Sequence, residues 1–145
     1  MKNKWFLSFL IFFITSFAIH SQASAEEIKE PPSASTQKTL ILTQALICES
    51  IKTNGPQNEA VVFSIQIGEV KCFTVFNPVP EKTFIYHKWF HKDKLSTKRK
   101  LSIKPPQWET YSRIQLREAD KGPWRVEITD SKGKLLRVLR FSITD

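Results

Sequence analysis

Two histidines four positions apart, His87 and His91, could in principle share a metal ion. On an α-helix this spacing places both imidazoles on one face, where they can bind zinc. The segment Phe84–Phe90 is instead rich in aromatic and β-branched side chains, which favour an extended strand. On a strand, at about 3.3 Å per residue, the two histidines are about 13 Å apart and cannot share an ion. We therefore predict hydrogen-bonded strand residues, with no metal and no other cofactor.

Cys48 and Cys72 are the two cysteines of the chain, and each falls on a separate predicted strand. In an exported chain they could form a disulfide, which would close a loop of about 25 residues and stabilise the fold by roughly 3 kcal/mol. The alternative is a pair of buried free thiols that pack as small hydrophobic groups. We favour the disulfide. No Cys-x-x-Cys spacing indicates a redox-active pair.

Signatures of hydrolytic enzymes are missing from the sequence. It contains no Gly-x-Ser-x-Gly elbow, no His-Glu-x-x-His motif and no glycine-rich phosphate loop. Four carboxylates of the C-terminal half are candidate acid or base groups: Glu109, Glu118, Asp120 and Glu127. Nothing in the sequence singles out two of them as a pair spaced for glycosidic cleavage. We expect no catalytic residue and a function other than catalysis.

A basic ribbon is the strongest functional indication. The chain has a net charge of +8, and Lys88 to Lys104 contains seven basic residues against Asp93 alone. Such a ribbon can attract an acidic glycan, a lipid headgroup or an acidic protein face, whereas nucleic acid fits an exported chain poorly. The alternative is a lysine-rich edge that only prevents pairing with other strands. The predicted contact residues are Lys92, Lys94, Lys98, Arg99, Lys100, Lys104 and Trp108.

Four aromatic residues could instead form a flat platform for a sugar: Trp89, Trp108, Tyr111 and Trp124. In a small β-domain such side chains usually fill the space between the sheets. Trp124 is in phase with Val126 and Ile128 and is predicted to lie in the core. Trp108 follows Pro105-Pro106 at the entry of a strand, and we expect it to be the one that is partly exposed.

The strand Phe84–Phe90 is predicted to position these groups. Alternation places Ile85, His87 and Trp89 on one face. Apolar groups occupy both faces, so we expect an interior strand, with the polar segment Leu95–Ile103 beside it at a solvated edge. Further strands are predicted at Leu40–Cys48, Ala60–Ile67, Glu69–Phe76, Trp108–Ile114, Trp124–Thr129 and Leu135–Ile143.

Seven to eight short strands separated by turn signals, without a convincing amphipathic helix, predict an all-β fold. We expect an antiparallel, immunoglobulin-like β-sandwich that occupies residues 39–145 as one domain. In its last hairpin, Leu139, Phe141 and Ile143 should face inward.

The N-terminal region has the pattern of a secretory signal peptide over residues 1–25: Lys2 and Lys4, an apolar run, and Ala23-Ser24-Ala25. The apolar run of Trp5–Ala18 is shorter than the roughly 20 residues of a membrane-spanning helix. A polar tether follows over residues 26–38. We therefore expect a periplasmic or secreted chain with no transmembrane segment after cleavage.

Several segments in order resemble the bacterial domain of unknown function 2914 family: Ala45–Cys48, Lys71–Thr74, Ile85–Phe90, Trp108–Ser112, Gly122–Glu127 and Leu139–Phe141. The resemblance covers roughly Leu42 to Thr144. It implies a shared domain but no activity, ligand or catalytic residue, because the family has none established.

Together these features predict a non-catalytic binding or adaptor module of the cell envelope, with an envelope protein or an anionic polymer as its partner. A structural envelope protein without a small ligand and a small hydrolase are the alternatives.

Overall fold

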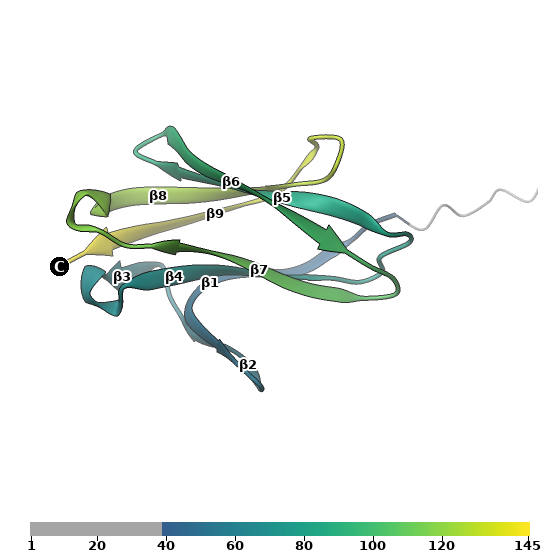
Figure 1. Cartoon of the computed structure of the whole chain (residues 1–145), viewed down its shortest axis with the longest axis horizontal. Coiled ribbons are helices and arrows are strands. Elements are labelled where there is room, and N and C mark those ends of the chain that lie inside the picture. Colours follow the sequence, from purple (N-terminus) through teal and green to yellow (C-terminus); the bar gives the residue numbers. More distant parts are fainter. Residues whose placement is uncertain (1–38) are drawn as a thin grey trace, which may run out of the picture. The chain divides into compact units, whose positions relative to one another are not determined.

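The computed structural model describes residues 39–145. The predicted signal peptide over 1–25 and the tether over 26–38 lie outside the described residues. Residues 39–145 fold into two β-sheets that pack face to face, so the predicted all-β sandwich is confirmed (Figure 1). Among these residues, no helix is long and apolar enough to cross a membrane.

The first sheet has four strands in the order β2-β1-β4-β7, and every neighbouring pair is antiparallel. Its strands are β1 (Leu42–Lys52), β2 (Gly55–Glu59), β4 (Glu69–Phe76) and β7 (Trp108–Gln115). The second sheet has five strands in the order β3-β9-β8-β5-β6. Its strands are β3 (Val62–Ser64), β5 (Thr83–His91), β6 (Lys94–Ile103), β8 (Gly122–Thr129) and β9 (Leu135–Thr144).

Residues 39–145 form nine strands, where the sequence predicted seven to eight. The additional strand β2 begins at Gly55-Pro56, a dipeptide typical of a break; proline is tolerated here because β2 is an edge strand. The predicted strand Ala60–Ile67 is shorter than expected. Only β3 forms, pairing in parallel with β9, and a 3-10 helix, η1 (Ile65–Ile67), follows it. The sheet is therefore mixed.

Alternating side chains of β5 and β8 build the core between the sheets. Ile85 and Trp89 of β5 are fully buried, as are Val126 and Ile128 of β8. Because truncating a buried tryptophan to alanine costs about 3–5 kcal/mol, Trp89 is a major anchor of the fold. The predicted inward positions of both strands are confirmed. So is the interior position of β5, which pairs with β6 and β8.

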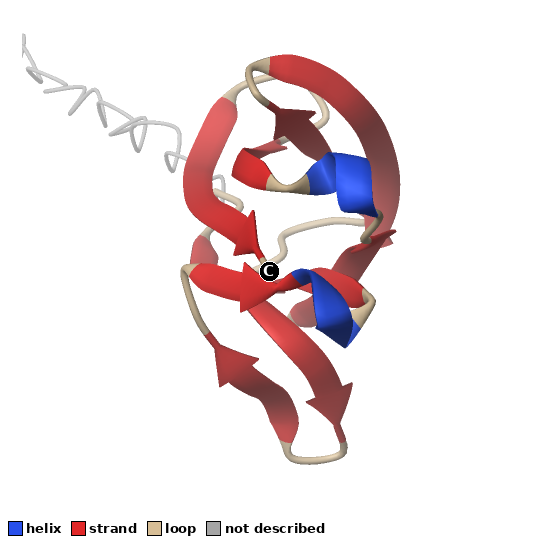
Figure 2. Cartoon of the chain, turned by 90° about the vertical axis from the view of Figure 1, so that its left-hand side faces the viewer, coloured by secondary structure: helices blue, strands red, loops and turns tan. Residues whose placement is uncertain are grey.

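Short 3-10 helices occur at one end of the sandwich: η1 and η2 (Glu118–Asp120), drawn in blue in Figure 2. The two regions are joined where the amide of Leu116 donates to the carbonyl of Gly68 at 2.8 Å. At the opposite end, Pro105-Pro106 connects β6 to β7. These two edge strands come together at that loop and separate toward the end with η2 (Figure 1).

Candidate functional site

The outer face of the five-stranded sheet carries a row of aromatic residues on β5. Phe84, Tyr86 and Phe90 alternate with the buried residues of the strand and are only partly covered. Phe84 and Tyr86 contact each other edge to face, with ring centroids 5.5 Å apart. Lys88 lies between Tyr86 and Phe90 on the same face. Strand β5 therefore contributes the central row of side chains of the site.

Cations from the neighbouring strands lie over these rings. The Nζ atoms of Lys98 and Lys100 on β6 lie 3.9 Å from the ring centroids of Tyr86 and Phe84, respectively. On β8, the guanidinium carbon of Arg125 lies 4.0 Å from the centroid of Phe90. Each such contact contributes roughly 0.5–1 kcal/mol at an exposed site and restricts where the charge can lie. The side chains are therefore held over the sheet.

Strand register also places like charges directly opposite each other. Lys88 pairs with Lys98 across β5 and β6, and Arg125 pairs with Arg140 across β8 and β9. Directly opposed like charges destabilise a sheet by a few tenths to about 1 kcal/mol per pair. We call this set of cations the cationic ladder; its members are Lys88, Lys98, Lys100, Arg125 and Arg140.

Few carboxylates balance the cationic ladder. Glu127 lies on the same face and contacts Arg125 at 3.2 Å, and Asp93, in the turn after β5, forms a second ion pair with Arg125. Among residues 39–145, Lys88, Lys98, Lys100 and Arg140 have no ion-pair partner. The face therefore presents several ammonium and guanidinium donors that an external anion could engage.

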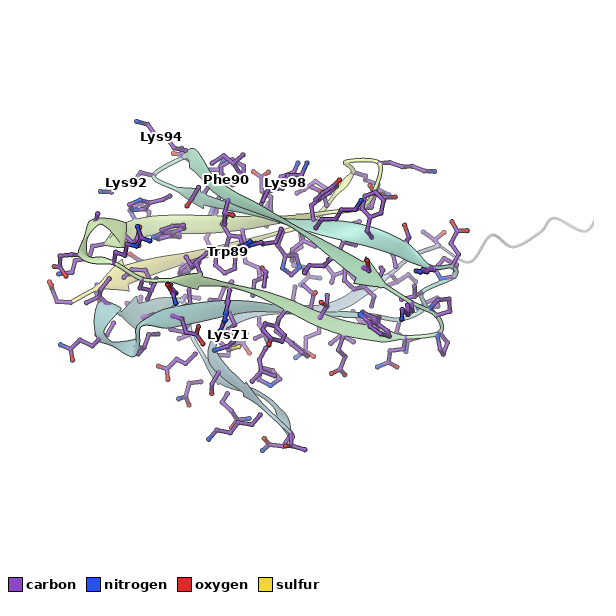
Figure 3. All side chains as sticks on the ribbon, viewed as in Figure 1. Lys71, Trp89, Phe90, Lys92, Lys94 and Lys98 are labelled. Carbon is purple, nitrogen blue, oxygen red and sulfur yellow. The ribbon has the colours of Figure 1, made fainter. Side chains whose placement is uncertain are left out.

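The predicted ribbon residues do not form one patch. Lys98 and Lys100 belong to the cationic ladder, whereas Arg99 projects from the opposite face of β6, beside the buried His87. Lys92 and Lys94 lie at the β5–β6 turn, on the same outer side as Lys98 in Figure 3. At about 3.3 Å per residue, the ten-residue strand β6 separates its two ends by about 30 Å.

At the far end of β6, Lys104 lies with its Nζ atom 5.5 Å from the ring centroid of Trp108. Trp108 is partly buried and packs against the core. Of the four aromatic residues considered for a sugar platform, Tyr111 is the most exposed, at 48%. The prediction that Trp108 is partly exposed is confirmed; Tyr111, which points outward from the edge strand β7, is more exposed than Trp108. Trp89 and Trp124 are buried between the sheets, as Figure 3 shows for Trp89.

A buried polar network lies directly beneath the cationic ladder. The indole N–H of Trp89 donates to Ser112 Oγ at 2.9 Å, and Ser112 Oγ lies 2.9 Å from His87 Nδ1. On the other side of the imidazole, Nε2 lies 3.3 Å from Thr74 Oγ1, whose hydroxyl donates to the carbonyl of Thr110. The network joins β5 of one sheet to β4 and β7 of the other.

These contacts assign the tautomer of His87. Because the Thr74 hydroxyl donates to a carbonyl, its oxygen accepts from His87 Nε2–H. Nδ1 then accepts from the Ser112 hydroxyl, which in turn accepts from Trp89. The neutral imidazole satisfies every polar atom of this chain. Burial lowers the pKa of His87 to about 4, since the charged form loses its hydration.

His91 has a separate environment. Its ring stacks on Trp124, with centroids 4.6 Å apart, and Nε2 lies 3.1 Å from the carbonyl oxygen of Lys121. Within residues 39–145, no group of three or more histidine, cysteine or acidic residues could hold a metal ion. Both histidines are strand residues with hydrogen bonds, as the spacing predicted.

The favoured interpretation of a disulfide is not what the structure has. Cys48 and Cys72 are both buried free thiols. Ile47 lies opposite Cys72, and Cys48 lies opposite Lys71, so the two cysteine side chains point to opposite faces of the sheet. Cys72 packs in the central core, whereas Cys48 packs with Leu46 and others on the outer face. Side chains that point apart cannot be bridged without moving the backbone.

Three of the four carboxylates considered as catalytic groups have structural contacts. Glu118 pairs with Lys121, Glu127 pairs with Arg125, and Asp120 accepts from the backbone amide of Arg117 at 2.8 Å. Glu109 is exposed on β7. These contacts are typical of surface and turn residues.

Three members of the cationic ladder were missed as site residues: Lys88, Arg125 and Arg140. Alternation alone puts Lys88 on the same face as Phe84, Tyr86 and Phe90, and it puts Arg140 on the face opposite Phe141. The missing information was the sheet order, because β8 follows β5 only after about 30 residues yet pairs with it, and β9 in turn pairs with β8.

Residues 82–143 match the model of a family described as a protein of unknown function, DUF2914. This segment belongs to the DUF2914 family. The DUF2914 match begins immediately before β5 and ends in β9, so it contains the whole cationic ladder. It is shorter than the resemblance from Leu42 to Thr144 that the sequence indicated. No curated protein matches the chain.

Proposed function

We propose that this protein is an exported, non-catalytic binding module, and that the cationic ladder is its contact surface for an anionic partner of the cell envelope. The observation that carries the proposal is the direct pairing of Lys88 with Lys98 on a sheet face that also holds Lys100 and Arg140, four cations without an ion-pair partner among residues 39–145. An arrangement that lowers the stability of the free protein becomes favourable when an anion lies between the charges.

The aromatic rings beneath the cations support a binding role. Contacts with Tyr86, Phe84 and Phe90 restrict Lys98, Lys100 and Arg125 before any partner arrives. Ordering a long side chain at an interface costs about 0.5–1.5 kcal/mol, so restriction in the free protein lowers the cost of binding. An acidic polymer or an acidic protein surface could engage several of these cations at once.

A hydrolase is the less favoured function. His87 is fully buried with both ring nitrogens hydrogen-bonded, so a substrate in solvent could not reach it in this conformation. His91 has its Nε2 next to a backbone carbonyl and its ring against Trp124. These environments favour structural roles for both imidazoles.

A pull-down from cell-envelope extract tests the proposal. The purified protein is compared with a Lys98→Glu/Lys100→Glu variant at about 0.1 M and about 1 M salt, where the Debye length falls from about 10 Å to about 3 Å. Partners that depend on the ladder should be recovered from the wild type at low salt and lost both at high salt and in the variant.

The matched control is Lys132→Glu/Lys134→Glu, which reverses the same amount of charge in the exposed turn before β9. It should retain the partners. Recovery of the same partners by the ladder variant would show that the cationic ladder is only a solvated face. Equal loss in both variants would point to net charge rather than to this surface, and would also contradict the proposal.

A further inference from the structure

The inward-facing side chains of β6 change from apolar to polar along the strand. Ile103 is fully buried and Leu101 packs against the core, but the next residues on this face are Arg99 and Thr97. Arg99 lies opposite His87 of β5 and therefore projects toward the space between the two sheets rather than toward the cationic ladder. Arg99 belongs to the edge strand β6, which diverges from the edge strand β7 of the other sheet with distance from the Pro105-Pro106 loop (Figure 1).

A groove follows this opening and has a volume of about 450 Å³. Basic residues from three separate segments line it: Arg99 on β6, Arg113 on β7 and Arg117 after β7. Arg113 alternates with the buried Ser112 and Ile114, so it borders the groove from the outward side of β7. The buried Trp124 contributes to its floor. The remaining lining residues add hydroxyl, amide and apolar groups: Ser96, Thr97, Ile114 and Gln115.

Carboxylates in and beside the groove form few ion pairs with its arginine side chains. Asp120 lines the groove, but its Oδ2 accepts from the backbone amide of Arg117. Glu69 contacts Arg113 through a single pair of atoms at 3.2 Å, and the side chain of Arg113 is 63% exposed. Arg99 has no ion-pair partner within the described part of the chain. Most guanidinium N–H donors of the groove are therefore available to a ligand.

We propose that this groove is a second anion site, separate from the cationic ladder, that binds an oxyanion group such as a phosphate or a carboxylate. A guanidinium presents a planar fork of N–H donors that matches two oxygens of such a group. The hydroxyls of Ser96 and Thr97 can donate to a third oxygen. The groove is confined to the opening between β6 and β7, whereas the ladder extends along the outer face of the sheet.

Titration of the purified protein with sodium phosphate, and separately with sodium glucuronate, tests the site at constant ionic strength. Backbone amide shifts followed by NMR should saturate at residues 96–99 and 113–117, with a Kd on the order of 1 mM. A response to phosphate alone or to glucuronate alone identifies which oxyanion the groove prefers. Shifts that rise linearly at lysines over the whole surface would overturn the proposal.

The variant Arg99→Gln/Arg117→Gln should weaken binding at least tenfold. It leaves the Arg113–Glu69 ion pair in place, and it keeps the backbone amide of residue 117 that donates to Asp120. Arg99→Lys retains the charge without the planar fork and should weaken binding several-fold. Unchanged binding in the double variant would overturn the proposal, and a thermal unfolding midpoint near that of the wild type would show that the variant is folded.

Separate variants test the cationic ladder and the groove, so one proposal can be refuted without the other. Lys98→Glu/Lys100→Glu alters the opposite face of β6 and should leave the Kd for phosphate within about threefold, since nearby charge acts only through solvent. If this variant abolishes saturable binding while Arg99→Gln/Arg117→Gln does not, the anion binds the cationic ladder and not the groove.

Discussion

His87 makes the stability of the fold depend on pH. The imidazole is fully buried, and its two nitrogens are engaged by Ser112 and Thr74 in a way that only the neutral ring satisfies. A proton on Nδ1 would oppose the Ser112 hydroxyl and place a charge among apolar side chains. The unfolded chain takes up this proton freely, so acid favours unfolding.

The size of the effect follows from the two pKa values. Burial lowers the pKa of His87 to about 4, against 6.5 for an unperturbed histidine. The unfolded state then binds more protons between these values, and the free energy of unfolding falls as the pH falls through 6.5 and levels off below about 4. The full loss is about 3 kcal/mol, of which about 2 kcal/mol occurs between pH 7 and pH 5.

Urea unfolding followed by tryptophan fluorescence at pH 7, 6 and 5 measures this loss. His87→Gln can still donate and accept hydrogen bonds but does not titrate. We expect it to be less stable than the wild type at pH 7 and to lose about 2 kcal/mol less than the wild type between pH 7 and pH 5. Ser102→Ala, on the exposed face of β6, is the control, and it should retain the wild-type dependence on pH.

Equal losses for the wild type and His87→Gln would refute the reasoning, because another group would then carry the proton uptake. A flat stability profile for the wild type would refute it as well, since His87 would titrate alike in the folded and unfolded states.

Two further predictions concern buried groups. Ser112→Ala leaves the Trp89 N–H and His87 Nδ1 without their partner, so it should lower the free energy of unfolding by about 2–4 kcal/mol. The control, Ser102→Ala on the exposed face of β6, should change the free energy of unfolding little. Equal effects of the two substitutions would contradict the buried polar network. Both cysteines should resist maleimide in the folded protein and react with it after denaturation without a reductant, which mass spectrometry can measure. A denatured protein that does not react, and whose mass is two hydrogens below that of the dithiol form, would instead indicate a disulfide.

Much of the fold could be predicted because β5, β8 and β9 have strong local alternation. In β5, the buried Ile85, His87 and Trp89 alternate with partly covered residues, as a strand between two neighbours requires. Strand β2 was missed because its five residues, Gly55–Glu59, contain no hydrophobic alternation and depend on pairing with β1.

The candidate site was predicted only in part. The excess of positive charge on β6 is visible in the sequence, but consecutive residues of a strand point to opposite faces. Lys98 and Lys100 therefore join the cationic ladder while Arg99 turns to the groove. Neither Arg113 nor Arg117 could be assigned to that groove from the sequence, since β6 and β7 belong to different sheets.

The all-β class, the faces of the principal strands and the concentration of charge on β6 can all be read from the amino-acid order, because a period of two is a local property of a strand. Which cations share a face, and which hydrophobic cluster each cysteine joins, depends on how the strands pair in the folded chain. Register and sheet order arise from contacts between distant segments, such as Lys88 with Lys98 and Cys48 with Lys71. A shift of one residue in either pairing would exchange the faces and so change the site.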